Sequence, residues 1–306
     1  MERPPRWILG CGNFGGIGSA PAFFERGETR AEAFSVMDAA WALGLDWFDT
    51  ADAYGGGRSE SWIGDWIRTT GSRPRITTKT YNPMEEGADH GLRRGRVLRQ
   101  LETSLGRLGV DHVDLYLAHE HDPDVPPAEL VATFGQLRDG GAIRAWGVSN
   151  FDAAQLRETL EHGRPAAVQN SYSLLDRRDE EELLPLCAEH GIAYQAFGPL
   201  AGGWLTGKYR RDEPAPPGSR MTMRPEPYRH LDDERVYSGI EALERFARGR
   251  EVSTAALALA WVTASVPAVV GPRRPEHLET VREAASVRLS PAERDELGSL
   301  FPRWPS

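Results

Sequence analysis

The sequence has few cysteines, few lysines and no long hydrophobic run, and each shortage argues against a class of protein. Cys11 and Cys187 are the only cysteines in 306 residues, so no disulfide framework is expected and a reducing cytoplasm is favoured. No stretch reaches the roughly 18 consecutive apolar residues of a membrane-spanning helix. Residues 1–5 contain no apolar signal core, so no secretory leader is expected there. A net charge of −9 argues against nucleic acid as a partner.

The shortage of lysine also indicates where chemistry takes place. The chain has 34 arginines but only two lysines, Lys79 and Lys208. A lysine ammonium is a compact charge whose pKa shifts with its surroundings, whereas a guanidinium stays charged. In a chain that uses arginine almost everywhere, the two lysines mark positions where arginine would not serve.

Short apolar runs alternate with amphipathic stretches along the chain. Eight strand-then-helix units of this kind predict an α/β fold, a single-domain (β/α)8 barrel over residues 1–306. The expected strands are Trp7–Leu9, Leu45–Asp49, Ile76–Lys79, Val113–His119, Ala145–Ser149, Ala167–Gln169, Ile192–Phe197 and Pro267–Gly271. Helices are expected from the Thr29–Glu32 capping box to Leu43 and over Ser59–Arg68, Leu92–Leu108, Pro127–Arg138, Asp152–Glu161, Glu180–His190, Asp232–Arg248, Ser253–Thr263, Pro275–Ala285 and Pro291–Leu300. A long loop is expected from Gly198 to His230.

A doubly wound open sheet is the alternative fold, because Gly10, Gly12 and Gly15 match the spacing of a dinucleotide-binding fingerprint. The motif follows a strand, as the fingerprint requires. However, the next helical pattern begins only near Thr29, so the motif does not open a helix. The glycines are therefore interpreted as part of the first strand-to-helix loop of a barrel.

The catalytic residues of a barrel lie at the C-terminal ends of its strands. Asp49 and Lys79 end two successive strands, and Tyr54 follows Asp49 by five residues. A free phenol has a pKa of about 10. A nearby ammonium lowers that pKa, and a buried ammonium needs a carboxylate partner. We therefore predict that Asp49 holds Lys79 and that Lys79 makes Tyr54 acidic enough to donate a proton.

His119 ends another strand and is followed by Glu120, His121 and Asp122. Such a cluster would suit a divalent metal in a hydrolase barrel. Against this, Asp122 precedes a proline that signals a turn, and ligands from other strands are not evident. His119 is therefore the predicted site residue, no metal is expected, and His121 is the alternative if the strand register differs.

Recognisable motifs follow one another along almost the whole chain. They are Asp49–Gly55, Lys79, Leu115–His119, Gly147–Phe151, Gln169–Leu174, Pro199–Lys208 and Val270–Pro275. These segments resemble those of the aldo-keto reductase family, in the order that the family has them. The Pro199–Gly203 segment is similar to the bacterial and aflatoxin-aldehyde-reductase-like branches.

The resemblance implies an NADPH-dependent enzyme that reduces an aldehyde or ketone carbonyl without a metal. Tyr54 would donate the proton, Lys79 and Asp49 would adjust the acidity of Tyr54, and His119 would orient the carbonyl oxygen. The alternative that the resemblance leaves open is a cofactor-sensing regulatory protein, like the relatives that associate with channels.

The resemblance also implies a set of cofactor-binding residues. Ser149, Asn150 and Gln169 would hold the nicotinamide carboxamide, and Phe197 would stack on the ring. Arg273 would bind the 2′-phosphate, with Arg274 as the next candidate and His277 as a weaker match, which favours NADPH over NADH. The pyrophosphate would lie against a glycine-rich loop that includes Gly198, Leu200, Gly202 and Lys208, and Gly271 at the last strand end would form a further phosphate site.

Two positions depart from the family pattern. The sequence also indicates the substrate pocket less clearly than the cofactor site. Phe197 stands where tyrosine is common, so a hydroxyl contact is lost. Val281 stands where asparagine is common near the adenine, which implies weaker adenine recognition. Candidate residues of the substrate pocket are Phe23, Phe24, Trp47, Tyr54, Tyr81, Glu120 and the 210–230 loop.

Overall fold

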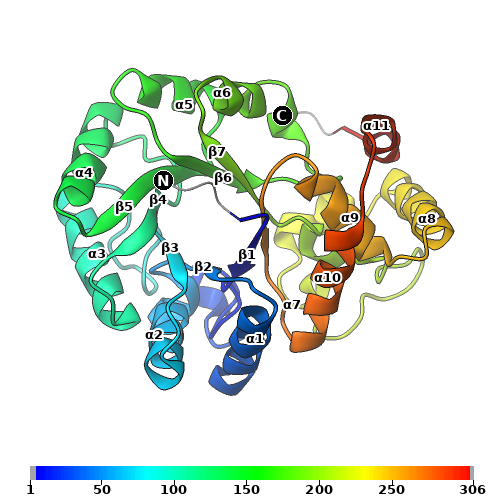
Figure 1. Cartoon of the computed structure of the whole chain (residues 1–306), viewed down its shortest axis with the longest axis horizontal. Helices are drawn as coiled ribbons and strands as arrows, with labels where there is room; N and C mark the ends of the chain where they lie inside the picture. Colours follow the sequence, from blue (N-terminus) through cyan, green and yellow to red (C-terminus); the bar gives the residue numbers. More distant parts are fainter. Residues whose placement is uncertain (1–4, 304–306) are drawn as a thin grey trace.

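The computed structural model describes residues 5–303, which form a closed barrel of eight parallel strands (Figure 1). Each strand pairs with the next one in the sequence, and the first pairs with the last, where Leu9 lies beside Val270. The strands are β1 (Trp7–Gly10), β2 (Trp47–Asp49), β3 (Arg75–Thr80), β4 (Val113–Ala118), β5 (Ile143–Ser149), β6 (Ala167–Ser171), β7 (Ala193–Phe197) and β8 (Ala268–Val270). The predicted (β/α)8 barrel is confirmed. Residues 1–4 and 304–306 of the predicted domain lie outside the described residues.

Helices surround the barrel (Figure 1). They are α1 (Arg30–Ala42), α2 (Arg58–Thr70), α3 (Arg94–Leu108), α4 (Pro127–Asp139), α5 (Ala153–Leu160), α6 (Leu183–Glu189), α7 (Arg220–Met223), α8 (Glu234–Gly249), α9 (Thr254–Thr263), α10 (Leu278–Ser286) and α11 (Pro291–Ser299). Short 3₁₀ helices are η1 (Pro21–Phe23), η2 (Tyr54–Gly57), η3 (Arg178–Glu180), η4 (Ala201–Thr206), η5 (Glu226–Leu231) and η6 (Pro275–His277). The predicted capping box begins α1: the Thr29 side chain accepts from the Glu32 amide, and the Glu32 carboxylate accepts from the Thr29 amide at 2.8 Å.

The strands are apolar on both faces because one face lines the barrel interior and the other packs under the helices. Leu115 and Leu117 of β4 point inward, to a small cluster that includes Trp47. Tyr116, between them, points outward and stacks on Phe134 of α4 with ring centroids 5.3 Å apart. Such an aromatic pair contributes about 0.5–1.5 kcal/mol beyond its buried area. The alternation along β4 therefore fixes which side chains reach the interior.

The connection between β7 and α8 differs from the loop that was expected there. It contains the short helices η4, α7 and η5. Gly202 and Gly203 take positive φ inside η4 and break the segment into separate turns, which explains why the sequence shows no helical periodicity. The segment returns to the first loop of the barrel, where Arg224 donates to the Ile17 carbonyl at 3.1 Å.

Gly10 ends β1, and the other glycines of the motif lie in the loop between β1 and α1, as predicted, because α1 begins only at Arg30. The loop folds tightly on itself. A Cβ on Gly27 would lie 2.0 Å from the Asn13 carbonyl oxygen, so only glycine fits there. Gly16 likewise packs against the backbone of Gly55, in the turn that carries Tyr54. These glycines therefore serve close backbone packing beside the strand ends. Within residues 5–303, no helix is both long and apolar enough to cross a membrane.

Candidate active site

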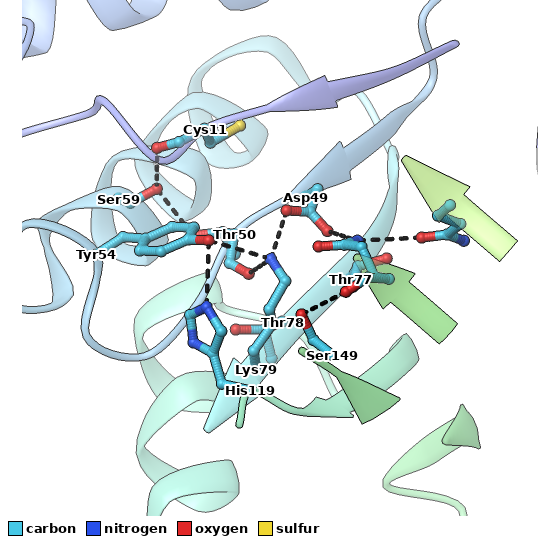
Figure 2. Close-up of polar contacts among 12 residues, drawn as sticks. Cys11, Asp49, Thr50, Tyr54, Ser59, Thr77, Thr78, Lys79, His119 and Ser149 are labelled. Carbon is cyan, nitrogen blue, oxygen red and sulfur yellow. Dashed lines mark hydrogen bonds and ion pairs between the residues drawn. The ribbon is translucent and has the colours of Figure 1, made fainter. Parts of the chain in front are cut away.

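Asp49, Lys79, Tyr54 and His119 meet at the C-terminal end of the barrel (Figure 2). Asp49 is the last residue of β2, Lys79 lies near the end of β3, Tyr54 begins η2, and His119 directly follows β4. The Lys79 ammonium donates to Asp49 Oδ1 at 2.5 Å and lies 3.4 Å from the Tyr54 hydroxyl oxygen. His119 Nε2 lies 3.5 Å from the same oxygen. The structure therefore brings together the four residues that the strand-end argument predicted.

The Asp49 carboxylate is held from two sides. Its Oδ1 faces Lys79, and its Oδ2 accepts from the Gln169 amide nitrogen at 2.7 Å. That nitrogen also lies 3.1 Å from Gln195 Oε1. Lys79 makes a further bond to the Thr50 carbonyl at 2.9 Å. Each buried charge is thus hydrogen-bonded, as burial requires. Gln195 had not been identified from the sequence.

Burial and charge act in opposite directions on this group. Burial lowers the pKa of Lys79, but Asp49 and Tyr54 more than offset this, so its pKa lies above the ordinary value. Burial raises the pKa of Tyr54, and Lys79 lowers it by less, so its net shift is upward. The predicted net lowering of the Tyr54 pKa is therefore wrong. At neutral pH Lys79 is an ammonium and Tyr54 is a protonated phenol.

Asn82 determines which nitrogen of His119 carries the proton. Burial, and then the Lys79 charge, hold the pKa of His119 well below its ordinary value, so the ring is neutral at pH 7. The Asn82 amide nitrogen lies 3.3 Å from Nδ1 and can only donate. Nδ1 therefore accepts, and Nε2, which faces Tyr54, bears the hydrogen. Asn82 was missed from the sequence because it lies in a loop without a recognisable pattern.

A cavity of about 1000 Å³ opens beside the four residues. Asp49, Tyr54 and His119 line it, whereas Lys79 lies behind them and is only 1% exposed. All of the residues predicted to bind a cofactor line the same cavity: Ser149, Asn150, Gln169, Phe197, Gly198, Leu200, Gly202, Lys208, Gly271, Arg273 and His277. Residues at or after the ends of six strands, β2 and β4 to β8, thus share one space.

Lys208, Arg220 and Arg273 line the cavity and lie close enough for their charges to interact. Arg224 also lines the cavity. Burial, and then Arg273 and Arg220, lower the pKa of Lys208, which shows that the three charges act on one another. An anionic ligand would relieve that repulsion, so the donor set fits a phosphate-bearing cofactor. Arg220 was assigned from the sequence only to a general substrate loop, because α7 was not expected.

The comparisons with known proteins agree with this geometry. Residues 8–300 match the sequence model described as the Aldo/keto reductase family. The chain belongs to this family. A protein named NADH-specific methylglyoxal reductase, from Escherichia coli strain K12, is 30% identical over 93% of this chain and 91% of its own length. The solved glycerol dehydrogenase of Gluconobacter oxydans superposes with a TM-score of 0.84 at 27% identity, covering 100% of this chain and 96% of that one.

A third relative carries a different name. A probable voltage-gated potassium channel subunit beta of Arabidopsis thaliana is 33% identical over 75% of this chain and 74% of its own length. The family match and the relatives named as reductases make this aldo-keto reductase an NAD(P)H-dependent oxidoreductase.

In this aldo-keto reductase the residues predicted to hold a carboxamide also hold one another. Ser149 donates to the Gln169 carbonyl at 2.7 Å. Asn150 takes a left-handed backbone conformation, with φ of 58°, and its amide nitrogen donates to the His119 carbonyl at 2.9 Å. Because the Gln169 amide nitrogen donates to Asp49, the side-chain oxygen of Gln169 remains available to a ligand. The trio therefore has a fixed geometry.

The alternative metal cluster is spread apart in the structure. The His121 ring packs edge-on against Phe151, and Asp122 accepts from the Leu92 amide at 2.7 Å. Within residues 5–303, no three histidine, cysteine or acidic side chains are arranged to hold a metal ion. Of the substrate-pocket candidates outside the 210–230 loop, Tyr54 and Glu120 line the cavity. Trp47 instead lies in the barrel interior, with its indole nitrogen 2.7 Å from the Thr77 hydroxyl.

Proposed function

We propose that this aldo-keto reductase reduces an aldehyde or ketone with NADPH and that Tyr54 donates the proton. The observation that carries the proposal is the hydrogen bonding around the Tyr54 oxygen. Lys79 donates toward this oxygen, and His119 presents its Nε2 hydrogen to the same atom. Because the Tyr54 oxygen accepts from these two donors, the hydrogen of the hydroxyl points away from both of them. Tyr54 lines the cavity, so this hydrogen is free to pass to a carbonyl oxygen that is bound there.

The residues that line the cavity are suited to bind a nicotinamide cofactor. When bound, the dihydronicotinamide supplies a hydride to the carbonyl carbon. Ser149, Asn150 and Gln169 would hold its carboxamide, and Phe197 would cover its ring. Lys208 and Arg220 would meet the pyrophosphate, and Arg273 would meet the 2′-phosphate, as the basis for preferring NADPH. The remaining loop contacts would come from Gly198, Leu200, Gly202, Gly271 and His277.

Each catalytic side chain has a separate role in the proposal. Lys79 stabilises the phenolate that remains when Tyr54 gives up its proton, and Asp49 keeps Lys79 in place. When a carbonyl compound is bound, His119 donates its single Nε2 hydrogen to the substrate oxygen instead of to Tyr54, and so orients that oxygen and stabilises its developing negative charge. Since His119 is neutral, its donation adds no positive charge to a site that already holds Lys79. The net charge of −9 and the two free cysteines fit a small-molecule substrate and a cytoplasmic location.

Turnover and binding measured side by side test the proposal. Wild-type protein is mixed with NADPH and a panel of aldehydes and ketones, and the loss of nicotinamide absorbance is followed. Dissociation constants for NADPH come from fluorescence titration. We expect turnover in the wild type, and we expect Tyr54→Phe to lose it while binding NADPH normally. A Tyr54→Phe variant that keeps its rate would show that another group donates the proton.

The similarity to a potassium channel beta subunit favours a second candidate, in which bound cofactor reports the redox state to a partner. The two candidates differ in one result. A sensor would bind NADPH tightly and show no turnover with any carbonyl of the panel, whereas the reductase turns over. The assembled proton-donating group, with Lys79 and Asp49 in contact, supports the reductase.

A further inference from the structure

The arginine proposed to bind the 2′-phosphate already has a partner. Arg273 follows β8 and lines the cavity, and its Nε donates to Oε1 of Glu28. Glu28 lies in the loop between β1 and α1, and its side chain is 3% exposed, against 37% for Arg273. The two residues are 245 positions apart in the chain. The pair thus joins the first and last strand-to-helix connections beside the cavity.

Arg273 has no complete edge left for a phosphate. A guanidinium binds an oxyanion best through two parallel N–H groups, either Nε with Nη2 or Nη1 with Nη2. Glu28 occupies Nε, and the Gly218 carbonyl accepts from Nη1 at 2.6 Å. One nitrogen of each edge is therefore used. A 2′-phosphate must displace one of these acceptors to bind in the bidentate manner.

Glu28 also brings a negative charge to the place where the phosphate would lie. Arg273 is its hydrogen-bonded counterion, and Arg220 is a further cation nearby. Among residues 5–303, Glu28 Oε2 is buried and has no hydrogen-bond partner. Withdrawing Arg273 would leave this carboxylate without its main partner, next to a phosphate of like charge. NADH has no 2′-phosphate and avoids both penalties.

We propose that Glu28 is a specificity-determining residue, which weakens the preference for NADPH over NADH by competing with the 2′-phosphate for Arg273. The inference rests on the proposed function, because it takes Arg273 as the 2′-phosphate ligand. It assigns opposite effects to two residues in contact. Arg273 favours the phosphate, and Glu28 opposes it.

The test is the ratio of the dissociation constants for NADH and NADPH, measured by fluorescence titration on the full chain. Glu28→Gln keeps the shape of the side chain and removes its charge. We expect this ratio to rise about tenfold or more, through tighter NADPH binding with NADH nearly unchanged. Arg273→Ala should lower the ratio, and adding Glu28→Gln to it should raise the ratio by less than Glu28→Gln does in the wild type, because the competition for Arg273 is gone and only the repulsion between Glu28 and the phosphate is left to relieve.

Glu25→Gln is the matched control. Glu25 lies in the same loop, pairs with Arg58 at 2.6 Å and is 76% exposed, so its loss should leave the ratio unchanged. Thermal melting checks the fold of every variant. If Glu28→Gln does not fold, Glu28→Asp replaces it, because a side chain that is one methylene shorter moves the carboxylate away from Arg273. A ratio above that of the wild type would then support the proposal, and an unchanged ratio would overturn it.

The outcomes separate this inference from the proposed function. If wild-type protein binds neither nucleotide, the proposed function fails. If it binds and oxidises NADPH but Glu28→Gln leaves the ratio unchanged or lowers it, the proposed function stands and the role of Glu28 is overturned. A fall in the ratio would mean that Glu28 positions Arg273 for the phosphate instead of competing with it.

Discussion

Replacing Asn82 by aspartate should invert the hydrogen-bonding pattern of His119 without altering the cofactor residues. The Asn82 amide nitrogen, 3.3 Å from Nδ1, can only donate, whereas a carboxylate at that place can only accept. Nδ1 would then carry the hydrogen, and Nε2 would become an acceptor facing Tyr54 and the substrate oxygen. The reaction would lose one of its two donors to the carbonyl oxygen.

The size of the effect follows from the role of that donor. Loss of one donor to a developing oxyanion costs about 10²–10³ in kcat. Asn82→Leu removes the hydrogen bond without imposing the opposite tautomer. Since a typical hydrogen bond contributes about 0.5–1.5 kcal/mol, this variant should lose only about twofold to tenfold. Aspartate should therefore be much more damaging than leucine, although it is closer to asparagine in shape.

Steady-state kinetics between pH 6 and 8 provide the deciding assay. A carboxylate at position 82 should raise the pKa of His119, which burial and Lys79 hold well below its ordinary value in the wild type. As the pH falls through the raised pKa, His119 gains a second proton and Nε2 can donate again. Activity of Asn82→Asp should thus recover toward low pH, and that of Asn82→Leu should not. Equal losses in both variants, or no recovery, would refute the tautomer argument. The NADPH dissociation constant should stay at the wild-type value in both.

Three further predictions follow from other parts of the structure. Tyr54→Phe should lower kcat by about 10²–10⁴ with NADPH binding retained, as single-turnover kinetics and titration would show. Because the Tyr54 pKa is raised, carbonyl reduction should be nearly independent of pH from about 7 to 9, whereas alcohol oxidation should increase with pH, since it needs the phenolate; a flat oxidation profile would contradict this. Gly27→Ala should lower the free energy of unfolding by about 1–3 kcal/mol, because its Cβ would meet the Asn13 carbonyl oxygen. Gly106→Ala in α3 is the control: the new Cβ would meet nothing within 4 Å apart from its own helix backbone, so this variant should raise the free energy of unfolding by about 0.5–1 kcal/mol in chemical denaturation.

The barrel could be predicted because the sequence patterns that specify its strands and helices are local. Each strand is a short apolar run, and each is followed by a helical period of suitable length, so the order of elements determines the topology. The position of the site follows from the same rule, because Asp49 and Lys79 are strand-end residues of a closed parallel barrel. The loop from Gly198 to His230 could not be resolved in this way. Its short helices depend on glycines at positive φ and on contacts with the first loop, such as that of Arg224.

The residues that the sequence did not reveal act through distant partners. Glu28 and Arg273 are 245 positions apart, and Arg220 donates to Asn13 Oδ1 across 207 positions. Arg273 lies in the Val270–Pro275 motif, but the other three residues have no local pattern that marks them. Asn82 is only 37 positions from His119, but its role depends on which atom of its amide faces the ring. The identity of a catalytic side chain can therefore be read from the sequence more readily than the groups that orient it.

The Tyr54 pKa illustrates the same limit in electrostatic terms. Residue types alone show that a cation lies near the phenol, and this predicts greater acidity. They do not show how far the phenol is buried, and its burial raises the pKa by more than Lys79 lowers it. A protonated phenol at neutral pH is nevertheless what a proton donor needs. The ammonium 3.4 Å away stabilises the phenolate once the proton has moved to a more basic alkoxide. Burial therefore keeps Tyr54 protonated before the reaction, and Lys79 acts mainly by stabilising the phenolate that forms as the proton leaves.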